Sequence, residues 1–134
     1  MKIIIAIGER GEMLFNKRRV SRDEYIIDDI IKVTGGNLTV KPYSAKLFAR
    51  YPEVKITEGG SLDAGTCEWC FIEDEELFSA LKDASALLIY NFNRTYPSDV
   101  KFDTVPVEMG FSLKSESSFA GHSHDKITRL LYER

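Results

Sequence analysis

The chain begins and ends in segments that have the pattern of β-strands. The first, Lys2 to Ile7, is almost continuously apolar, and the last, Ile127 to Arg134, carries strand-like apolar residues to the end of the sequence. A strand that is covered on both faces needs such a run of apolar side chains. We therefore expect the two segments to lie side by side in one sheet and to cover a pocket made electropositive by arginine side chains.

Between these segments, strand-like and helix-like patterns alternate. A helix is predicted after Ser21-Arg22-Asp23-Glu24, where Ser21 and Glu24 would form a capping box. It is expected to end at Gly35-Gly36. Its apolar residues recur at helical spacing: Ile26, Ile27, Ile30 and Ile31.

The rest of the chain predicts an α/β protein. Helices are expected over residues 44–51 and 75–84, and strands over 38–40, 54–56, 69–72 and 86–90, with further strands from Phe102 onward. Strands that alternate with helices favour a mostly parallel sheet with helices packed on it, here with an antiparallel edge. At 134 residues the chain fits a single domain, 1–134.

Composition restricts the classes of function. Hydrophobic residues at 43% and charged residues at 29% are typical of a globular protein, and the formal net charge of -3 does not favour nucleic-acid binding. No segment has the roughly 20 apolar residues of a membrane span, and no leader pattern begins the chain. We therefore expect a cytoplasmic protein with no membrane partner.

A cluster of cations precedes the first predicted helix. Lys17, Arg18, Arg19 and Arg22 lie within six residues, next to Asn16. Guanidinium groups beside a helix start can bind a phosphate or a carboxylate, so the cluster predicts a site for a small anionic or phosphate-bearing ligand. The equally weighted alternative is a solvated face, paired with neighbouring carboxylates: Asp23, Glu24, Asp28 and Asp29.

A polar segment follows the strand predicted to end at Tyr90. Asn91, Asn93, Arg94 and Asp99 would lie beyond the carboxyl end of a parallel strand, where α/β sheets bind ligands. The alternative, which we favour slightly, is a turn held by Asn and Asp side chains.

His122 and His124 are the only histidines, and a histidine can act in acid–base chemistry near neutral pH. The favoured alternative is a polar loop or a helix start. Cys67 and Cys70 have no partners at the spacing of a zinc site, so we expect buried structural thiols and no metal.

The order of these fragments resembles a shortened, degenerate dihydrofolate reductase, which implies the three-layer α/β fold of that family. The matching fragments are Ile3 to Ile7, Gly11, Asn16, Asp23, Leu88-Ile89-Tyr90-Asn91, Asp99-Val100-Lys101-Phe102, and the closing Tyr132-Glu133-Arg134. The resemblance implies that Asp23 takes the place of the proton-relay acid. Asn91 takes the place of the hydroxyl that supports it.

The departures from that family matter equally. Its Pro-Trp after the Asn loop is replaced by Lys17-Arg18-Arg19, and the place of its paired glycines is taken by Phe71-Ile72-Glu73-Asp74-Glu75. Carboxylates at that place would repel a dinucleotide pyrophosphate, so the nicotinamide site is expected to be lost.

A second resemblance is to short, uncharacterised bacterial proteins that share the Met-Leu-Phe-Asn-Lys-Arg-Arg stretch and a closing Ser-His-Asp-Lys-Ile-Thr segment, and that are sometimes labelled ribonuclease Z. Here His122-Ser123-His124-Asp125-Lys126 has the wrong register for the metal motif of that nuclease class.

The function expected from the sequence is a small-molecule or anion-binding module on a reductase-like scaffold, without nicotinamide-dependent activity and with no cofactor indicated. The alternatives are an oxidoreductase of the dihydrofolate reductase type and, less favoured, a ribonuclease using His122, His124 and Lys126. The candidate catalytic residues are Asp23, Asn91 and His124. The candidate ligand-binding residues are Asn16, Lys17, Arg18, Arg19, Arg22, Asn93 and Arg94.

Overall fold

The computed structural model describes residues 1–58 and 68–134, and its centre is a seven-stranded sheet of order β5-β4-β6-β1-β7-β10-β9. The first five of these strands run parallel, and β10 and β9 are antiparallel at one edge. The strands are β1 (Lys2–Ile7), β4 (Leu38–Val40), β5 (Lys55–Ile56), β6 (Trp69–Phe71), β7 (Ala86–Asn91), β9 (Ser112–Phe119) and β10 (Ile127–Glu133). The predicted mostly parallel sheet with an antiparallel edge is confirmed.

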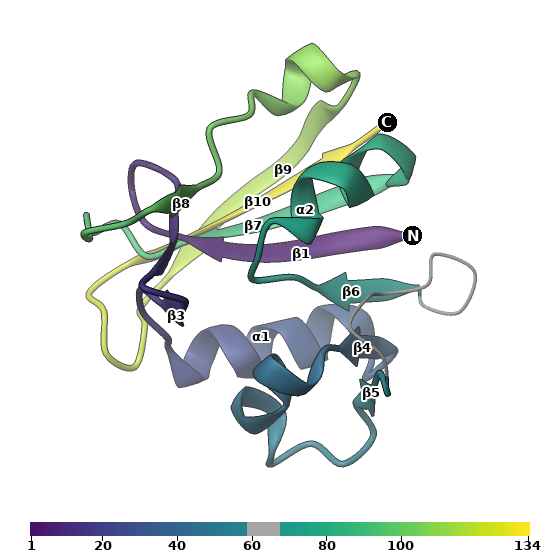
Figure 1. The fold of residues 1–134 in the computed structure, drawn as a ribbon, viewed down its shortest axis with the longest axis vertical. Coiled ribbons are helices and arrows are strands. Elements are labelled where there is room, and N and C mark those ends of the chain that lie inside the picture. The colour runs from purple at the N-terminus through teal and green to yellow at the C-terminus, as the bar shows by residue number, and fades with distance from the viewer. Residues whose placement is uncertain (59–67) are drawn as a thin grey trace.

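Helices lie on both faces of this sheet, as Figure 1 shows for α1 and α2. A small second sheet of order β3-β2-β8 lies beyond the carboxyl end of β1. The helices and short strands are β2 (Glu12–Phe15), β3 (Arg18–Arg19), α1 (Glu24–Thr34), the 3-10 helix η1 (Pro42–Phe48), α2 (Glu76–Ala80), the 3-10 helix η2 (Leu81–Asp83), β8 (Val100–Lys101) and the 3-10 helix η3 (Pro106–Met109).

The alternation of side chains along β1 builds two cores. Ile3 and Ile5 are fully buried against α2, in the same cluster as Leu77, whereas Ile4 is fully buried against α1, in the same cluster as Ile30. Successive strand residues point to opposite faces, so a strand with helices on both sides must be apolar at every position. This explains the continuous apolar run at the start of the chain.

The termini share the sheet, but they are not neighbours in it. Strand β7 separates β1 from β10, because β7 pairs with β1 on one side and with β10 on the other. Both hydrogen-bonding edges of β1 are occupied, by β6 and β7. The expectation that the first and last segments lie side by side is therefore wrong in detail.

Three predicted helices differ from the observed ones in their start, their type or their continuity. Helix α1 begins after Asp23, whose side chain accepts a hydrogen bond from the backbone N–H of Tyr25, so Asp23 rather than Ser21 is the N-cap. The helix expected over 44–51 is the 3-10 helix η1, which begins at Pro42. The helix expected over 75–84 is divided into α2 and η2.

Within the described residues, no helix combines the length and the apolar character needed to cross a lipid bilayer.

Candidate functional site

The polar site lies where α1 begins, beside the carboxyl ends of β1 and β7. Three separate parts of the chain meet there: the segment Ser21 to Asp23 before α1, the segment Phe92 to Tyr96 after β7, and the loop between β9 and β10 that carries His124. The sheet order brings β7 and β10 together, so their connecting loops reach the same end of the sheet as the start of α1. The site is therefore a product of the tertiary fold.

Asp23 is 2% exposed, and its carboxylate accepts four hydrogen bonds. Oδ1 accepts from the backbone N–H groups of Tyr25 and His122, each at 2.9 Å. Oδ2 accepts from the Ser123 N–H at 2.9 Å and from His124 Nδ1 at 2.8 Å. Burial alone would raise the pKa of Asp23, but these hydrogen bonds together lower it below its usual value, because they stabilise the charged form.

His124 is held in one orientation. Because the ionised Asp23 can only accept, Nδ1 of His124 carries a proton and donates it, which leaves a lone pair on Nε2 of the neutral ring. Two hydroxyl groups lie 3.0 Å from Nε2, those of Ser21 and Tyr96. The ring also stacks on Phe92, with 4.9 Å between the ring centroids.

Ser21 and Tyr96 were not identified as site residues from the sequence. Ser21 was interpreted as the helix cap, and its hydroxyl instead contacts His124. Tyr96 is fixed through its backbone, because its N–H donates at 2.6 Å to Glu12, a carboxylate that is only 1% exposed. No local sequence pattern predicts the contacts of Ser21 and Tyr96 with His124, because His124 is distant from both in the sequence.

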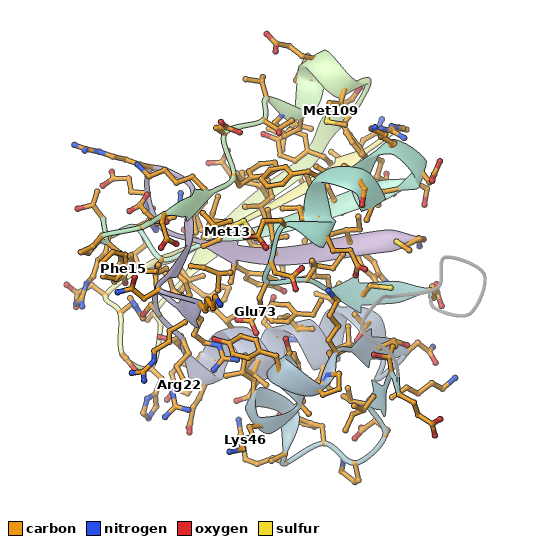
Figure 2. All side chains as sticks on the ribbon, in the orientation of Figure 1. Met13, Phe15, Arg22, Lys46, Glu73 and Met109 are labelled. Carbon is orange, nitrogen blue, oxygen red and sulfur yellow. The ribbon has the colours of Figure 1, made fainter. Side chains whose placement is uncertain are left out.

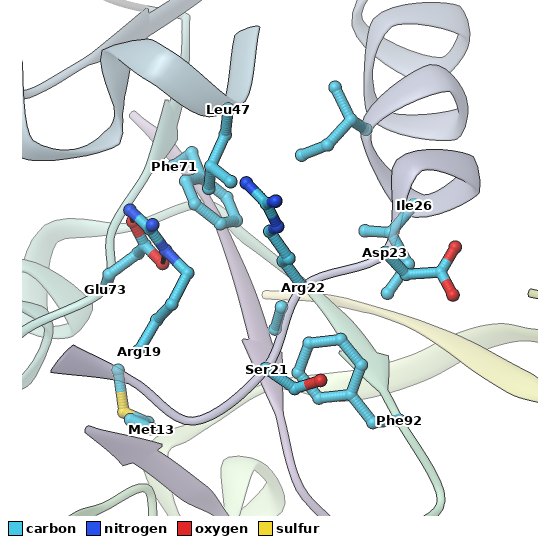
Figure 3. Close-up of a pocket in the computed structure, with 12 residues that line it drawn as sticks. Met13, Arg19, Ser21, Arg22, Asp23, Ile26, Leu47, Phe71, Glu73 and Phe92 are labelled. Atoms are coloured by element: carbon cyan, nitrogen blue, oxygen red, sulfur yellow. Dashed lines mark hydrogen bonds and ion pairs between the residues drawn. The ribbon is translucent and has the colours of Figure 1, made fainter. Parts of the chain in front are cut away.

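A small cavity of about 20 Å³ lies beside this network and is shown in Figure 3. In the figure the guanidinium group of Arg22 points toward Leu47 and Phe71, and the carboxylate of Asp23 points away from it. The lining residues include the hydroxyl-bearing Ser21 as well as Arg22 and Asp23.

A larger hollow of about 160 Å³ adjoins the first, between the start of α1 and η1. Its cations are Arg22, Lys46 and Arg50, and the two hollows share Arg22, Asp23, Ile27 and Leu47 as lining residues. Arg50 forms an ion pair with Asp28 at 2.8 Å. Figure 2 shows Arg22 and Lys46 projecting on the same side of the molecule. We call this hollow the α1–η1 cleft.

Arg19 forms an ion pair with Glu73. Its Nε and Nη2 atoms donate to the two oxygens of Glu73 at 2.8 and 3.0 Å, and its guanidinium lies over the ring of Tyr43. Ser44 also donates to Glu73, at 2.7 Å. The hydrogen bonds to Glu73 raise the pKa of Arg19 further, although its burial works against that change. The Arg19 charge is therefore largely neutralised inside the protein.

The other predicted ligand-binding cations lie elsewhere. Asn16 and Lys17 form the left-handed turn between β2 and β3, with φ values of 50° and 63°, and the Asn16 N–H donates to Asp99 at 3.1 Å. Lys17 lines a separate hollow of about 580 Å³ together with three carboxylates, Asp74, Glu75 and Asp99. Arg18 is exposed on β3. The four cations that are close in sequence therefore lie on different surfaces of the protein.

The polar segment after β7 stabilises its own turn. Asn91 accepts a hydrogen bond from the Asn93 N–H at 2.8 Å. The side-chain amide of Asn93 donates to the carbonyl of Lys126 and to the hydroxyl of Thr128, both at 3.0 Å. The carbonyl of Arg94 accepts from the Glu9 N–H, while its side chain is exposed. These contacts place Asn91 and Asn93 in the junction between β7 and β10.

The described residues contain no group of three or more side chains placed to hold a metal ion. Cys70 is fully buried in β6 and disulfide-bonded, so the expectation of a free buried thiol is wrong for this residue. Cys67 lies outside the described residues.

Comparison with known proteins identifies the fold. No protein-family model matches the sequence, and no curated protein matches it. Among solved structures, the chain is similar to a dihydrofolate reductase from Enterococcus faecalis complexed with NADP(H) and RAB-propyl, with a TM-score of 0.66 and 10% sequence identity. The alignment covers 100% of this chain and 96% of that chain. The chain therefore has a dihydrofolate-reductase-like α/β fold and a reductase-like scaffold.

Proposed function

We propose that this chain is a binding module on a dihydrofolate-reductase-like scaffold, and that it takes a small ligand bearing a phosphate or carboxylate group in the α1–η1 cleft. Arg22 is the anchor. Its guanidinium lines both adjoining hollows and forms no ion pair or hydrogen bond with any residue in 1–58 or 68–134. That position of Arg22 is the observation that carries the proposal.

The surroundings of Arg22 favour an anion. Lys46 lines the cleft from η1, and its ammonium group adds a second positive charge. The cleft also lies at the start of α1, an 11-residue helix whose dipole is positive at this end. Glu24 is the acidic group that lines the same cleft and is not buried. A guanidinium fork can bind one phosphate or carboxylate through two parallel hydrogen bonds.

The proposal assigns the ligand to this cleft and not to the turn between β2 and β3. Lys17 lines a hollow with three carboxylates, and Arg19 is bound to Glu73, so neither cation is well placed to attract an anion. Of the candidate ligand-binding residues, Arg22 has the central role. Asn93 and Arg94 lie in the junction between β7 and β10 and line neither hollow.

We also propose that the module acts without a nicotinamide cofactor, in the cytoplasm, and without a membrane or nucleic-acid partner. Support for the first point comes from Glu73 and Asp74, which follow β6 and bind Arg19 and Lys41. A pyrophosphate approaching this end of the sheet would meet carboxylates where free backbone donors are needed.

Thermal unfolding tests the binding proposal. Inorganic phosphate, citrate and a nucleoside monophosphate, added at constant ionic strength, should raise the midpoint of the wild-type protein, because a ligand stabilises the state that binds it. Arg22→Met should lose at least half of that increase, whereas Arg18→Met, an equal change of charge on exposed β3, should keep it. Equal losses in both variants would show that the effect is one of net charge, and would contradict the proposal.

A second candidate function is an oxidoreductase of the dihydrofolate reductase type, favoured by the full-length similarity to a structure complexed with NADP(H). In this candidate, Asp23 is the proton-relay acid and Asn91 supports it. The four hydrogen bonds that Asp23 accepts leave its carboxylate little capacity for a ligand. Titration with NADPH, followed by its fluorescence, separates the two candidates: saturable binding supports the oxidoreductase.

A further inference from the structure

Ser21, His124 and Asp23 are joined by hydrogen bonds in the arrangement of a nucleophile, a general base and the acid that orients the base. His124 Nδ1 lies 2.8 Å from Asp23 Oδ2, and His124 Nε2 lies 3.0 Å from Ser21 Oγ. These distances lie within the range over which a histidine removes a proton from a serine hydroxyl. Such constellations are recognised by geometry and roles rather than by sequence position.

The surroundings hold Nδ1 of His124 against the Asp23 carboxylate. The Asp23 carboxylate is fixed by three backbone N–H groups, so it remains ionised and holds the Nδ1 proton of His124. The lone pair of Nε2 therefore faces the serine hydroxyl. His124 is 5% exposed and stacked on Phe92, so the ring cannot rotate away without loss of packing.

Ser21, the candidate nucleophile, is the most accessible of the three hydrogen-bonded residues. Asp23 and His124 are buried, whereas Ser21 is half-buried and lines the small cavity beside Arg22. In Figure 3 the Ser21 side chain lies next to Phe92 on the edge of that cavity. A reactive serine needs this arrangement, in which the acid and the base are buried and the hydroxyl group can be reached by a substrate.

We propose that Ser21 is a nucleophile activated by His124, and that the chain carries acyl-transfer activity toward small carboxylic esters. Ser21 Oγ bonds to the carbonyl carbon while its proton passes to His124 Nε2. The bond to the leaving alcohol then breaks, and that oxygen takes the proton from Nε2. Water attacks the acyl-serine and gives a proton to Nε2. The bond from the acyl group to Ser21 then breaks, which releases the carboxylic acid and returns the proton to Oγ. This activity goes beyond the binding function and does not depend on an anion at Arg22.

Tyr96 gives a way to separate a reactive serine from a purely structural contact. Its hydroxyl also lies 3.0 Å from His124 Nε2, and a neutral imidazole has only one lone pair at that atom. The two hydroxyl groups therefore compete as donors. Tyr96→Phe removes the competitor, so it should raise the reactivity of Ser21.

The test is labelling with a fluorophosphonate probe, in which Ser21 Oγ bonds to phosphorus and fluoride leaves, followed by mass spectrometry of the labelled peptide. Release of 4-nitrophenol from 4-nitrophenyl acetate gives a second readout. We expect the label on Ser21, a loss of at least about 100-fold in both rates in Ser21→Ala, and rates in Ser117→Ala equal to wild type. Thermal unfolding of each variant checks that it is folded.

An unlabelled Ser21 in the wild-type protein would overturn the proposal, as would 4-nitrophenol release that Ser21→Ala leaves unchanged. Loss of labelling in Tyr96→Phe but not in Ser21→Ala would identify the tyrosine as the reacting group and would also overturn it. None of these results bears on Arg22→Met, so the binding proposal and the nucleophile proposal can fail separately.

Discussion

Nδ1 of His124 lies 2.8 Å from Oδ2 of Asp23, although 101 positions separate the two residues in the chain. This contact joins the loop between β9 and β10 to the first turn of α1. Asp23 is at the same time the N-cap of α1 and an acceptor for the backbone of His122 and Ser123. One buried carboxylate thus fixes a helix start and a distant loop together.

Asp23→Asn should reduce the stability at neutral pH by roughly 3 kcal/mol, because it leaves buried donors without their charged acceptor. The folded-state pKa of Asp23 lies below its usual value, so its stabilising contribution is complete above the unfolded pKa of about 3.9 and is lost as the pH falls through the lower, folded value. Urea unfolding at several acidic pH values measures this. The wild-type protein should lose stability below about pH 4 more steeply than Asp23→Asn.

Asp103→Asn is the matched control for that change, because Asp103 is exposed. It should leave both the stability and its pH dependence nearly unchanged. Parallel acid profiles for the wild type and Asp23→Asn would show that the hydrogen bonds at Asp23 do not depend on its charge.

Gly121→Ala should destabilise the protein by about 1–3 kcal/mol, because the loop wraps closely around Asp23. A Cβ atom at Gly121 would lie 2.6 Å from Asp23 Oδ2 and 2.7 Å from the carbonyl oxygen of His124. Both atoms belong to the network itself, so the loop has to shift. Thermal unfolding measures the loss, and a variant as stable as the wild type would contradict this close approach.

The pair of Arg19 and Glu73 should show a favourable coupling of about 1–2 kcal/mol in a double-mutant cycle with Arg19→Met and Glu73→Gln. The side chains are 22% and 11% exposed and joined by two hydrogen bonds, so solvent weakens the pair less than it weakens a surface pair. Chemical unfolding of the two single variants and the double variant gives the coupling. Additive losses would mean that Arg19 is free to bind a ligand.

Tyr90→Phe should cost about 1–2 kcal/mol, because the buried Tyr90 hydroxyl donates to Asp29 at 2.7 Å. Burial and this hydrogen bond raise the pKa of Tyr90 far above its usual value. In an ultraviolet titration of the folded protein, the Tyr90 phenol should therefore stay protonated through about pH 10, where a free tyrosine side chain ionises. Ionisation of all tyrosines together, without unfolding, would contradict this.

The fold was largely predictable from local patterns. The continuous apolar runs of β1 and β7 and the helical spacing of Ile26, Ile27 and Ile30 arise from burial on defined faces, and burial leaves a periodic signal in sequence. The motif from Ser21 to Glu24 predicted Ser21 as the N-cap, whereas Asp23 is the N-cap, because several residues in this motif can cap a helix. Distant backbone donors on Asp23 decide which one does so.

The site was less predictable, because proximity in sequence did not give proximity in space. The turn at Asn16 and Lys17 sends the cations in different directions, so that Arg19 meets Glu73 and Arg22 lines the α1–η1 cleft. The sequence singled out His124 as a candidate, and its catalytic role stays a prediction. Its contacts with Ser21 and Asp23 required the long-range pairing of β7 with β10.

The most direct test of the binding account is nuclear magnetic resonance mapping of inorganic phosphate at constant ionic strength. We expect saturable shifts in the side-chain N–H signal of Arg22 and in the backbone signals around Lys46, with little change at Lys17 and Arg18. Shifts confined to the turn between β2 and β3, or no saturable shift at Arg22, would contradict the assignment of the ligand to the α1–η1 cleft.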